Sequence, residues 1–118
     1  MTKKVLIVDD AQVDRLHLER IVANAGHLVL LAESGAQALE CARNNLPDLI
    51  FMDINMPGMD GFAATRKLKS DDTTKSIPVV FVSSKNQKAD QAWGQMLGAK
   101  GYVSKPYSED QILVQLQG

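Results

Sequence analysis

The sequence is poor in cysteine, in long apolar runs and in net charge, and each shortage excludes a class of protein. Cys41 is the single cysteine, so no disulfide can form within the chain, which fits a reducing compartment. No stretch approaches the roughly 18 consecutive apolar residues of a membrane span. With 13 basic and 14 acidic residues the net charge is −1, so nothing attracts the whole chain to nucleic acid or to an anionic membrane. Any charge that matters must be local.

The length and the N-terminus are typical of a small single-domain protein. The 118 residues are 45% hydrophobic and 23% charged, as in a globular fold, and fall below the ~150 residues of an average domain. We therefore expect one domain over residues 1–118, with no room for a separate output domain. Only a short apolar run separates Lys4 from Asp9, too short for a signal peptide. The sequence thus predicts a cytoplasmic protein without a membrane-inserted segment.

Short apolar runs bounded by turn residues recur along the chain. They cover residues 5–8, 28–32, 49–52, Ile77 with residues 79–82, and 101–103. Runs of this length are typical of strands buried on both faces of a parallel sheet. We therefore expect a strand at each of them.

The segments between these runs have helical spacing. The first carries Leu16, Arg20 and Ala23 on one side, and Gly26 is placed to end it in a left-handed conformation. Ser34 and Ser108 are each followed three residues later by glutamine, the capping-box pattern that opens a helix. A further helix is expected over residues 61–69. An apolar stripe typical of a core-facing helix is formed by Ala89, Ala92, Trp93, Met96 and Leu97.

Strands that alternate with helices predict a doubly wound α/β fold. For a five-stranded chain of this kind we expect the strand order 2-1-3-4-5 of the flavodoxin-like fold. In such sheets the ligand site lies beyond the carboxyl ends of the strands, where the strand order reverses. Here that point falls between the first and third strands.

Polar side chains follow the predicted strands at this edge of the sheet. They are, in chain order, Asp9, Asp10, Asp53, Ser83, Ser84 and Lys105. Clustered carboxylates raise each other's pKa, and a divalent cation relieves the repulsion. Ligands that are all oxygen favour Mg²⁺, or Mn²⁺, over Zn²⁺. A carboxylate beside such a cation, with a hydroxyl and an ammonium group nearby, is equipped to take up a phosphoryl group.

Each of these residues also has an ordinary structural interpretation when it is taken alone. Asp9 and Asp10 could cap the following helix, and Asp53 could begin a turn with the Asn55, Pro57 and Gly58 that follow it. Lys105 could be a solvated surface lysine. All of them fall at the carboxyl ends of predicted strands, however, and this shared position favours a functional site.

Four segments carry a specific family resemblance. They are residues 5–10 (VLIVDD), 52–61 (MDINMPGMDG), 80–84 (VFVSS) and 98–106 (GAKGYVSKP). In this order and spacing the chain resembles, over essentially its full length, the receiver domain of bacterial two-component response regulators, chemotaxis regulators among them. Residues 88–94 and 98–99 are also similar to stand-alone receivers of type IV pilus twitching-motility systems. That second similarity rests mainly on Trp93 and Gly94, and we expect Trp93 to be a core residue of its helix.

The resemblance implies a role for each site residue. Asp53 would accept a phosphoryl group from a phosphohistidine on a histidine kinase or a phosphotransfer protein. The Mg²⁺ ligands would be Asp9, Asp10, Asp53 and the backbone carbonyl of Asn55. Lys105 and Ser83 would contact the phosphoryl oxygens, and the bond between Lys105 and Pro106 would be cis.

The same resemblance implies how a signal would leave the domain. Ser83, a serine where threonine is commoner, would act with Tyr102 as a switch, while Asn55 and Lys85 would influence dephosphorylation. Output would come from a downstream protein bound on the face made by the fourth helix, fifth strand and fifth helix, without nucleic acid, or from draining phosphate from a shared kinase. The domain would be a monomer or a weak phosphorylation-dependent dimer. It would not be an enzyme beyond catalysing its own phosphoryl transfer and dephosphorylation.

Three other functions are open on this fold. A flavin-binding electron carrier needs a hydroxyl-rich phosphate loop after the first strand, where this chain has Asp9 and Asp10. An aspartyl-phosphate phosphatase usually needs an acid–base aspartate two residues after its nucleophile, where this chain has Asn55. A receiver-like domain that works without phosphorylation would not need the set of Asp9, Asp10, Asp53 and Lys105.

Overall fold

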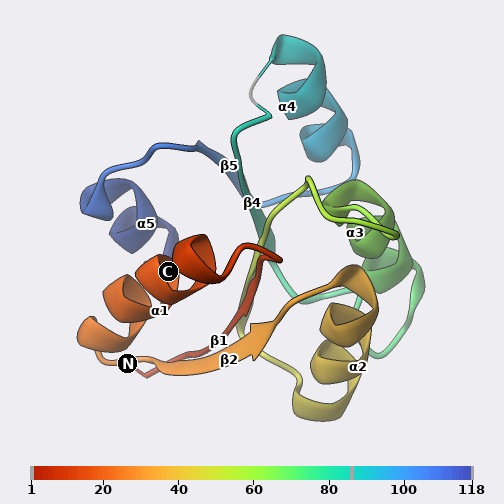
Figure 1. Ribbon diagram of the computed structural model, residues 1–118. Coiled ribbons are helices and arrows are strands. Elements are labelled where there is room, and N and C mark those ends of the chain that lie inside the picture. Colours follow the sequence, from red (N-terminus) through yellow and green to blue (C-terminus); the bar gives the residue numbers. More distant parts are fainter. Residues whose placement is uncertain (1, 86, 118) are drawn as a thin grey trace.

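A computed structural model describes residues 2–85 and 87–117, over which strands and helices alternate along the chain (Figure 1). The strands are β1 (Lys4–Val8), β2 (Leu28–Ala32), β3 (Leu49–Met52), β4 (Val79–Ser83) and β5 (Gly101–Ser104). The helices are α1 (Gln12–Asn24), α2 (Gly35–Asn45), α3 (Gly61–Ser70), α4 (Lys88–Met96) and α5 (Glu109–Gln115). Each predicted strand is present, and the bounds agree within one residue except at β4, which begins at Val79 and leaves out Ile77, which the prediction included.

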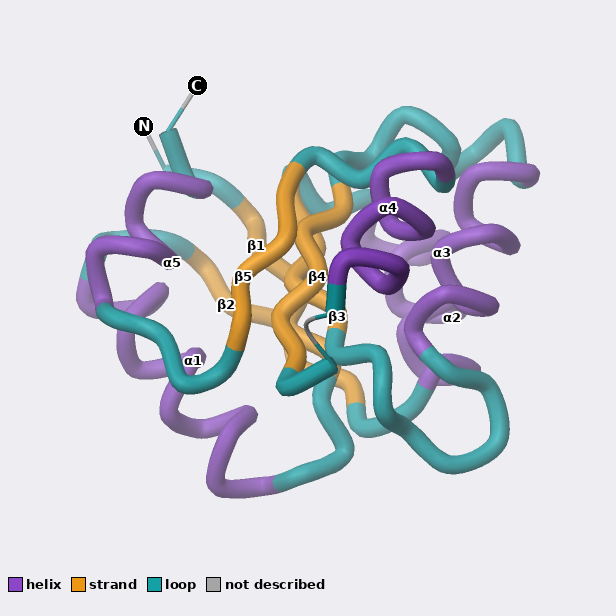
Figure 2. Tube along the Cα trace, turned by 90° about the horizontal axis from the view of Figure 1, so that it is seen from above, coloured by secondary structure: helices purple, strands orange, loops and turns teal. Residues whose placement is uncertain are grey.

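The strands pair in parallel in the order β2-β1-β3-β4-β5, which confirms the doubly wound, flavodoxin-like α/β fold. Helices α1 and α5 cover one face of the sheet, and α2, α3 and α4 lie on the other (Figures 1 and 2). The strand order reverses between β1 and β3, so the segments that follow these two strands leave toward opposite faces. A crevice therefore opens between them at the carboxyl edge of the sheet.

The central strands build two cores because successive side chains point to opposite faces of the sheet. Leu6 and Ile50 lie in the core beneath α2 and α3, whereas Ile7 and Phe51 lie in the core beneath α1 and α5. All four are at most 1% exposed. The central strands are thus apolar on both faces, as a sheet covered by helices on both sides requires.

The helix ends use the predicted capping residues. Ser34 accepts a hydrogen bond from the Gln37 N–H at 3.1 Å, and the Gln37 side chain in turn accepts one from the Glu33 N–H. Ser108 and Gln111 form both bonds of a capping box at the start of α5. Gly26 follows the end of α1 with a φ of 93°, the left-handed conformation expected of it.

The buried face of α1 differs from the prediction. Leu16, predicted to lie on the inner side, is 43% exposed, and Arg20 and Ala23 are exposed as well. The residues that face the sheet are Leu18, Ile21 and Val22, together with Arg15. Apolar residues occur on more than one side of this helix, so their spacing alone fits two faces. Packing against β1 and β3 selects the face that carries the branched side chains.

Strand β2 is less buried than predicted. Leu28 is 61% exposed and Leu31 is 40% exposed, because β2 is an edge strand that pairs only with β1 among the described strands. The apolar run at residues 28–32 predicts a strand correctly, but it cannot distinguish an edge from a centre. None of the described helices is both long and apolar enough to cross a membrane.

Helix α4 packs on the sheet through a glycine, and of its predicted apolar stripe Leu97 alone is half-buried against the core. Trp93 is 37% exposed and Met96 is 77% exposed, so the prediction that Trp93 is a core residue is wrong. The Arg66 guanidinium lies over the Trp93 ring, 5.6 Å from its centroid. Gly94 is the buried residue of α4, and a Cβ atom there would lie 3.1 Å from the Phe81 ring. The glycine therefore allows a close approach that a larger residue would prevent.

Candidate functional site

Three carboxylates meet at the carboxyl ends of β1 and β3. The Asp53 N–H donates to the Val8 carbonyl at 2.9 Å, which fixes the end of β3 beside the end of β1. Asp9, Asp10 and Asp53 each offer an oxygen within 4.8 Å of the others. Asp9 and Asp53 are buried at 5% and 7% exposure, whereas Asp10 is exposed. The structure therefore brings together the three acidic residues that the sequence places at this edge.

Neither Asp9 nor Asp10 is the N-cap of α1, although this was the ordinary structural interpretation open to them. Ala11 holds that position and makes no side-chain capping bond. The Asp9 carboxylate instead accepts a hydrogen bond from the Ala11 N–H at 2.9 Å, and its second oxygen faces the site.

The electrostatic setting of Asp53 is unfavourable for a negative charge. Burial raises the pKa of Asp53, and the neighbouring charge of Asp9 raises it further. Lys105 and hydrogen bonds from the Ile54 N–H and from Ser83 act in the opposite direction without reversing the rise. Any positive charge added in the crevice would therefore stabilise the ionised form of Asp53.

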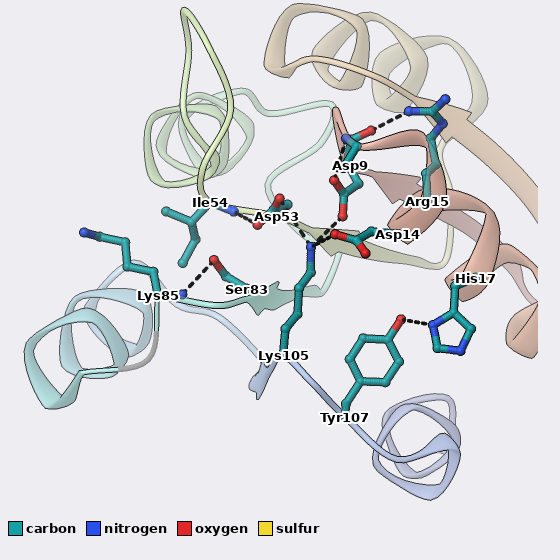
Figure 3. A network of polar contacts seen from close by, with 11 residues as sticks. Asp9, Asp14, Arg15, His17, Asp53, Ile54, Ser83, Lys85, Lys105 and Tyr107 are labelled. Atoms are coloured by element: carbon teal, nitrogen blue, oxygen red, sulfur yellow. Dashed lines mark hydrogen bonds and ion pairs between the residues drawn. The ribbon is translucent and has the colours of Figure 1, made fainter.

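Lys105 supplies such a charge from the segment that follows β5. Its Nζ lies 2.8 Å from Asp9 Oδ2, 3.0 Å from Asp14 Oδ2 and 3.5 Å from Asp53 Oδ2 (Figure 3). Burial acts against the ammonium charge, but the hydrogen bonds to Asp9 and Asp14 and the charge of Asp53 together raise the pKa of Lys105. Its bond to Pro106 is cis, as predicted.

Two residues of this network, Asp14 and Arg15, were not found by sequence reasoning. Asp14 stands in the first turn of α1, where an acidic residue is commonplace because it complements the helix dipole, so its presence carries no special signal. Arg15 is 8% exposed and donates to the Asp9 carbonyl oxygen at 2.8 Å, while its other end pairs with Glu33 at 3.2 Å. A buried arginine cannot be told from an exposed one until the buried face of the helix is known.

Ser83 and Tyr102 meet through the backbone of Lys85. Ser83 is fully buried at the end of β4, and its Oγ accepts a hydrogen bond from the Lys85 N–H at 3.2 Å. The Tyr102 hydroxyl donates to the Lys85 carbonyl oxygen. Burial, with the charges of Asp90 and Asp53, raises the pKa of Tyr102 to about 12, so its hydroxyl stays a donor. The Lys85 ammonium pairs with Asp90 at 3.6 Å and points away from Asp53 (Figure 3).

A cleft of about 550 Å³ opens onto this cluster. Asp10, Asp53, Asn55 and Lys105 line it, and Ser84 lies on its wall. The stacked rings of His17 and Tyr107, 5.6 Å apart and 10° from parallel, border its far end. A larger cavity of about 890 Å³ is lined by Lys3, Asp48 and Gln117. None of the three clustered aspartates lines it. The chemistry of the lining, rather than the volume, identifies the candidate site.

Comparison with known sequences identifies the family. A family model for the response regulator receiver domain matches residues 5–117. The chain is 43% identical over 110 residues to protein PilH of Pseudomonas aeruginosa, an alignment that covers 93% of this chain and 91% of PilH.

Comparison with solved structures agrees with the sequence match. Chemotaxis protein CheY4 of Vibrio cholerae has a TM-score of 0.92 at 30% identity, covering 99% of this chain and 98% of CheY4. The receiver domain of a sensor histidine kinase from Pseudomonas aeruginosa has a TM-score of 0.90 at 26% identity, covering 99% of this chain and 96% of that domain. That structure holds a magnesium ion in its active-site cleft. This chain belongs to the response regulator receiver domain family.

Proposed function

We propose that this receiver domain is a phosphorylation-controlled switch that accepts a phosphoryl group on Asp53. The observation that carries the proposal is the position of the Asp53 carboxylate, which is buried between Asp9 and Lys105 at the floor of the cleft. The donor would be a phosphohistidine on a histidine kinase or a phosphotransfer protein, the partners with which the receiver family works. The domain itself would catalyse the transfer. It would also catalyse its own dephosphorylation, which ends the phosphorylated state.

The donor set fits a hard divalent cation. Asp9, Asp10 and Asp53 offer carboxylate oxygens, and Asn55 would add its backbone carbonyl. Oxygen ligands of this kind suit Mg²⁺, with Mn²⁺ as the alternative. When bound, the cation would neutralise charge on the carboxylates and on the transferring phosphoryl group.

The chain's own residues would perform the transfer. An Asp53 carboxylate oxygen attacks the phosphorus, the P–N bond to the donor imidazole breaks, and the electron pair leaves with the imidazole nitrogen. Lys105 already lies 3.5 Å from Asp53 and would contact a phosphoryl oxygen. The Ser83 hydroxyl would donate to another. Asn55 on the cleft wall and Lys85 on the adjacent loop would influence the rate of dephosphorylation.

Output would use the α4–β5–α5 face. Ser83 and Tyr102 both bond to Lys85, so a movement of Ser83 toward a phosphoryl group is transmitted to Tyr102 at that face. The face would bind a downstream protein rather than nucleic acid, in a cytoplasmic domain that is a monomer or a weak phosphorylation-dependent dimer. The similarity to PilH and CheY4 supports a role in pilus motility or chemotaxis.

The test is incubation with acetyl phosphate and Mg²⁺, followed by intact-mass measurement. We expect a gain of one phosphoryl group that Asp53→Asn abolishes. Asp72→Asn is the matched control, because the Asp72 side chain is 95% exposed on a surface turn. Absence of the gain, or a gain that Asp53→Asn leaves unchanged, would contradict the proposal.

A further inference from the structure

Lys105 is held by three carboxylates, and only two of them belong to the cluster of Asp9, Asp10 and Asp53 that could bind a metal ion. The third is Asp14, whose Oδ2 lies 3.0 Å from Nζ. We propose that Asp14 is a positioning residue, which holds the Lys105 ammonium group on the α1 side of the site so that a divalent cation can occupy the aspartate cluster. The inference rests on the proposed function, because it concerns the binding of a divalent cation at the same site.

The need for such a residue follows from competition between two cations. The ammonium group of Lys105 and a divalent cation would both draw on the carboxylates of Asp9 and Asp53. A cation bound there would also repel the ammonium group, and the repulsion is strong in a partly buried site. Lys105 then needs a partner outside the cluster. Asp14 is suited to this role because its carboxylate is 47% exposed and reaches Lys105 from the side of α1.

A second contact between α1 and the same segment supports the inference. His17 lies one helical turn after Asp14 on α1, so the two side chains share a face. The His17 ring stacks on Tyr107, two residues beyond Lys105, and the Tyr107 hydroxyl lies 3.4 Å from His17 Nδ1. Residues 105–107 are thus tied to α1 by an ion pair at one end and by ring stacking at the other (Figure 3). This double attachment fixes the place from which the Lys105 side chain extends.

Without the Asp14 carboxylate, the Lys105 ammonium group would pair with Asp9 and Asp53 alone among its described partners. Mg²⁺ would then have to displace it, so we expect Asp14→Asn to weaken Mg²⁺ binding by about fivefold or more. Asp14→Glu keeps the charge and should stay within about twofold of the parent. Glu19→Gln is the matched control, since it removes one charge from the same helix at a residue outside the described partners of Lys105.

The deciding experiment is a double-mutant cycle with Lys105→Met, read by titrating the full chain with Mg²⁺ alone and following backbone amide shifts. If Asp14 acts through Lys105, Asp14→Asn should weaken binding by less than about twofold in the Lys105→Met background. An equal loss in both backgrounds would mean a plain charge effect and would overturn the inference, as would no loss in either.

The titration uses no phosphoryl donor, so its failure can be told apart from a failure of the proposed function. Failure of Asp53 to accept a phosphoryl group would leave the coupling between Asp14 and Lys105 standing. Loss of that coupling would in turn leave phosphorylation untouched. A second measurement needs no metal. If the two side chains form one unit, the shifts in urea midpoint caused by Asp14→Asn and by Lys105→Met should not add up in the double variant. Additive midpoints would count against the inference.

Discussion

The two sides of the candidate site are held in different ways. On the α1 side, Asp14 pairs with Lys105 and His17 stacks on Tyr107, so side chains tie the segment after β5 to the helix. On the α4 side, the described contacts of the loop after β4 include two hydrogen bonds to the backbone of Lys85 and an ion pair from the Lys85 side chain to Asp90. Helix α4 beyond it rests on the sheet through Gly94 and leaves Trp93 and Met96 exposed.

The two sides would also have different functions. The groups that would perform the chemistry need fixed positions, and they lie on the side where an ion pair and a ring stack join the segment after β5 to α1. The groups that would carry a signal outward need to adopt a second arrangement, and they lie on the side where Gly94 is the buried residue of the adjoining helix and Trp93 and Met96 are exposed. The two sides should therefore respond differently to substitution.

The largest effect is expected at Arg15, on the fixed side. Arg15→Met removes a buried donor and leaves the Asp9 carbonyl oxygen unsatisfied, which should lower the free energy of unfolding by about 2 kcal/mol. Arg20→Met, at an exposed position of the same helix, should change it by less than about 0.5 kcal/mol. Urea denaturation measures both. Equal losses would show that the Arg15 contact adds nothing to the fixed side.

On the α4 side, Gly94→Leu should lower the free energy of unfolding by about 1–2 kcal/mol, because the new side chain would overlap the Phe81 ring. Ala92→Leu on the exposed side of α4 is the control and should be close to neutral. We also expect Gly94→Leu to shift the NMR signals of Tyr102, whose ring lies 3.4 Å from the site of the added carbon. If both variants are neutral, α4 moves outward freely and the contrast between the two sides is even stronger.

The two tyrosines offer a direct comparison of the sides. Tyr102→Phe removes the bond to the Lys85 carbonyl and should cost about 1 kcal/mol, with faster hydrogen exchange in the loop after β4. Tyr107→Phe keeps the stack on His17 and loses only a long 3.4 Å contact, so it should cost less than about 0.5 kcal/mol. The reverse order would mean that the α4 side is not held by this bond.

The smallest effect is expected at Arg66. Its guanidinium lies over a partly exposed ring, so Arg66→Gln should change the free energy of unfolding by less than about 0.5 kcal/mol. Trp93 is the single tryptophan, so its fluorescence should nevertheless shift. Lys67→Gln, a neighbouring exposed residue, should shift neither. An unchanged spectrum for Arg66→Gln would show that the stacked arrangement is not populated in solution.

Sequence reasoning succeeds where the backbone decides the outcome. Five apolar runs predict five strands because a covered parallel sheet needs unbroken apolar strands, and parallel strands bring their carboxyl ends to one edge. The meeting of Asp9 and Asp53 follows from that rule without any knowledge of side-chain contacts.

It fails where side-chain packing decides. Asp14 and Arg15 become informative only when the rotation of α1 on the sheet is known, and apolar spacing fits a second rotation with Leu16 inside. Trp93 fits a core stripe by spacing, but the close approach at Gly94 turns α4 so that the tryptophan stays partly exposed. Both failures concern which way a helix faces, a property that depends on its neighbours more than on its own sequence.

The ion pair between Lys105 and Asp9 makes the candidate site depend on the complete fold. The two residues are 96 positions apart along the chain, and Asp53, directly after β3, lies between them in sequence. An unfolded or half-folded chain therefore carries no such constellation, since no local segment contains it. If the domain accepts a phosphoryl group as proposed, uptake should require the complete fold, and a misfolded copy should not be phosphorylated.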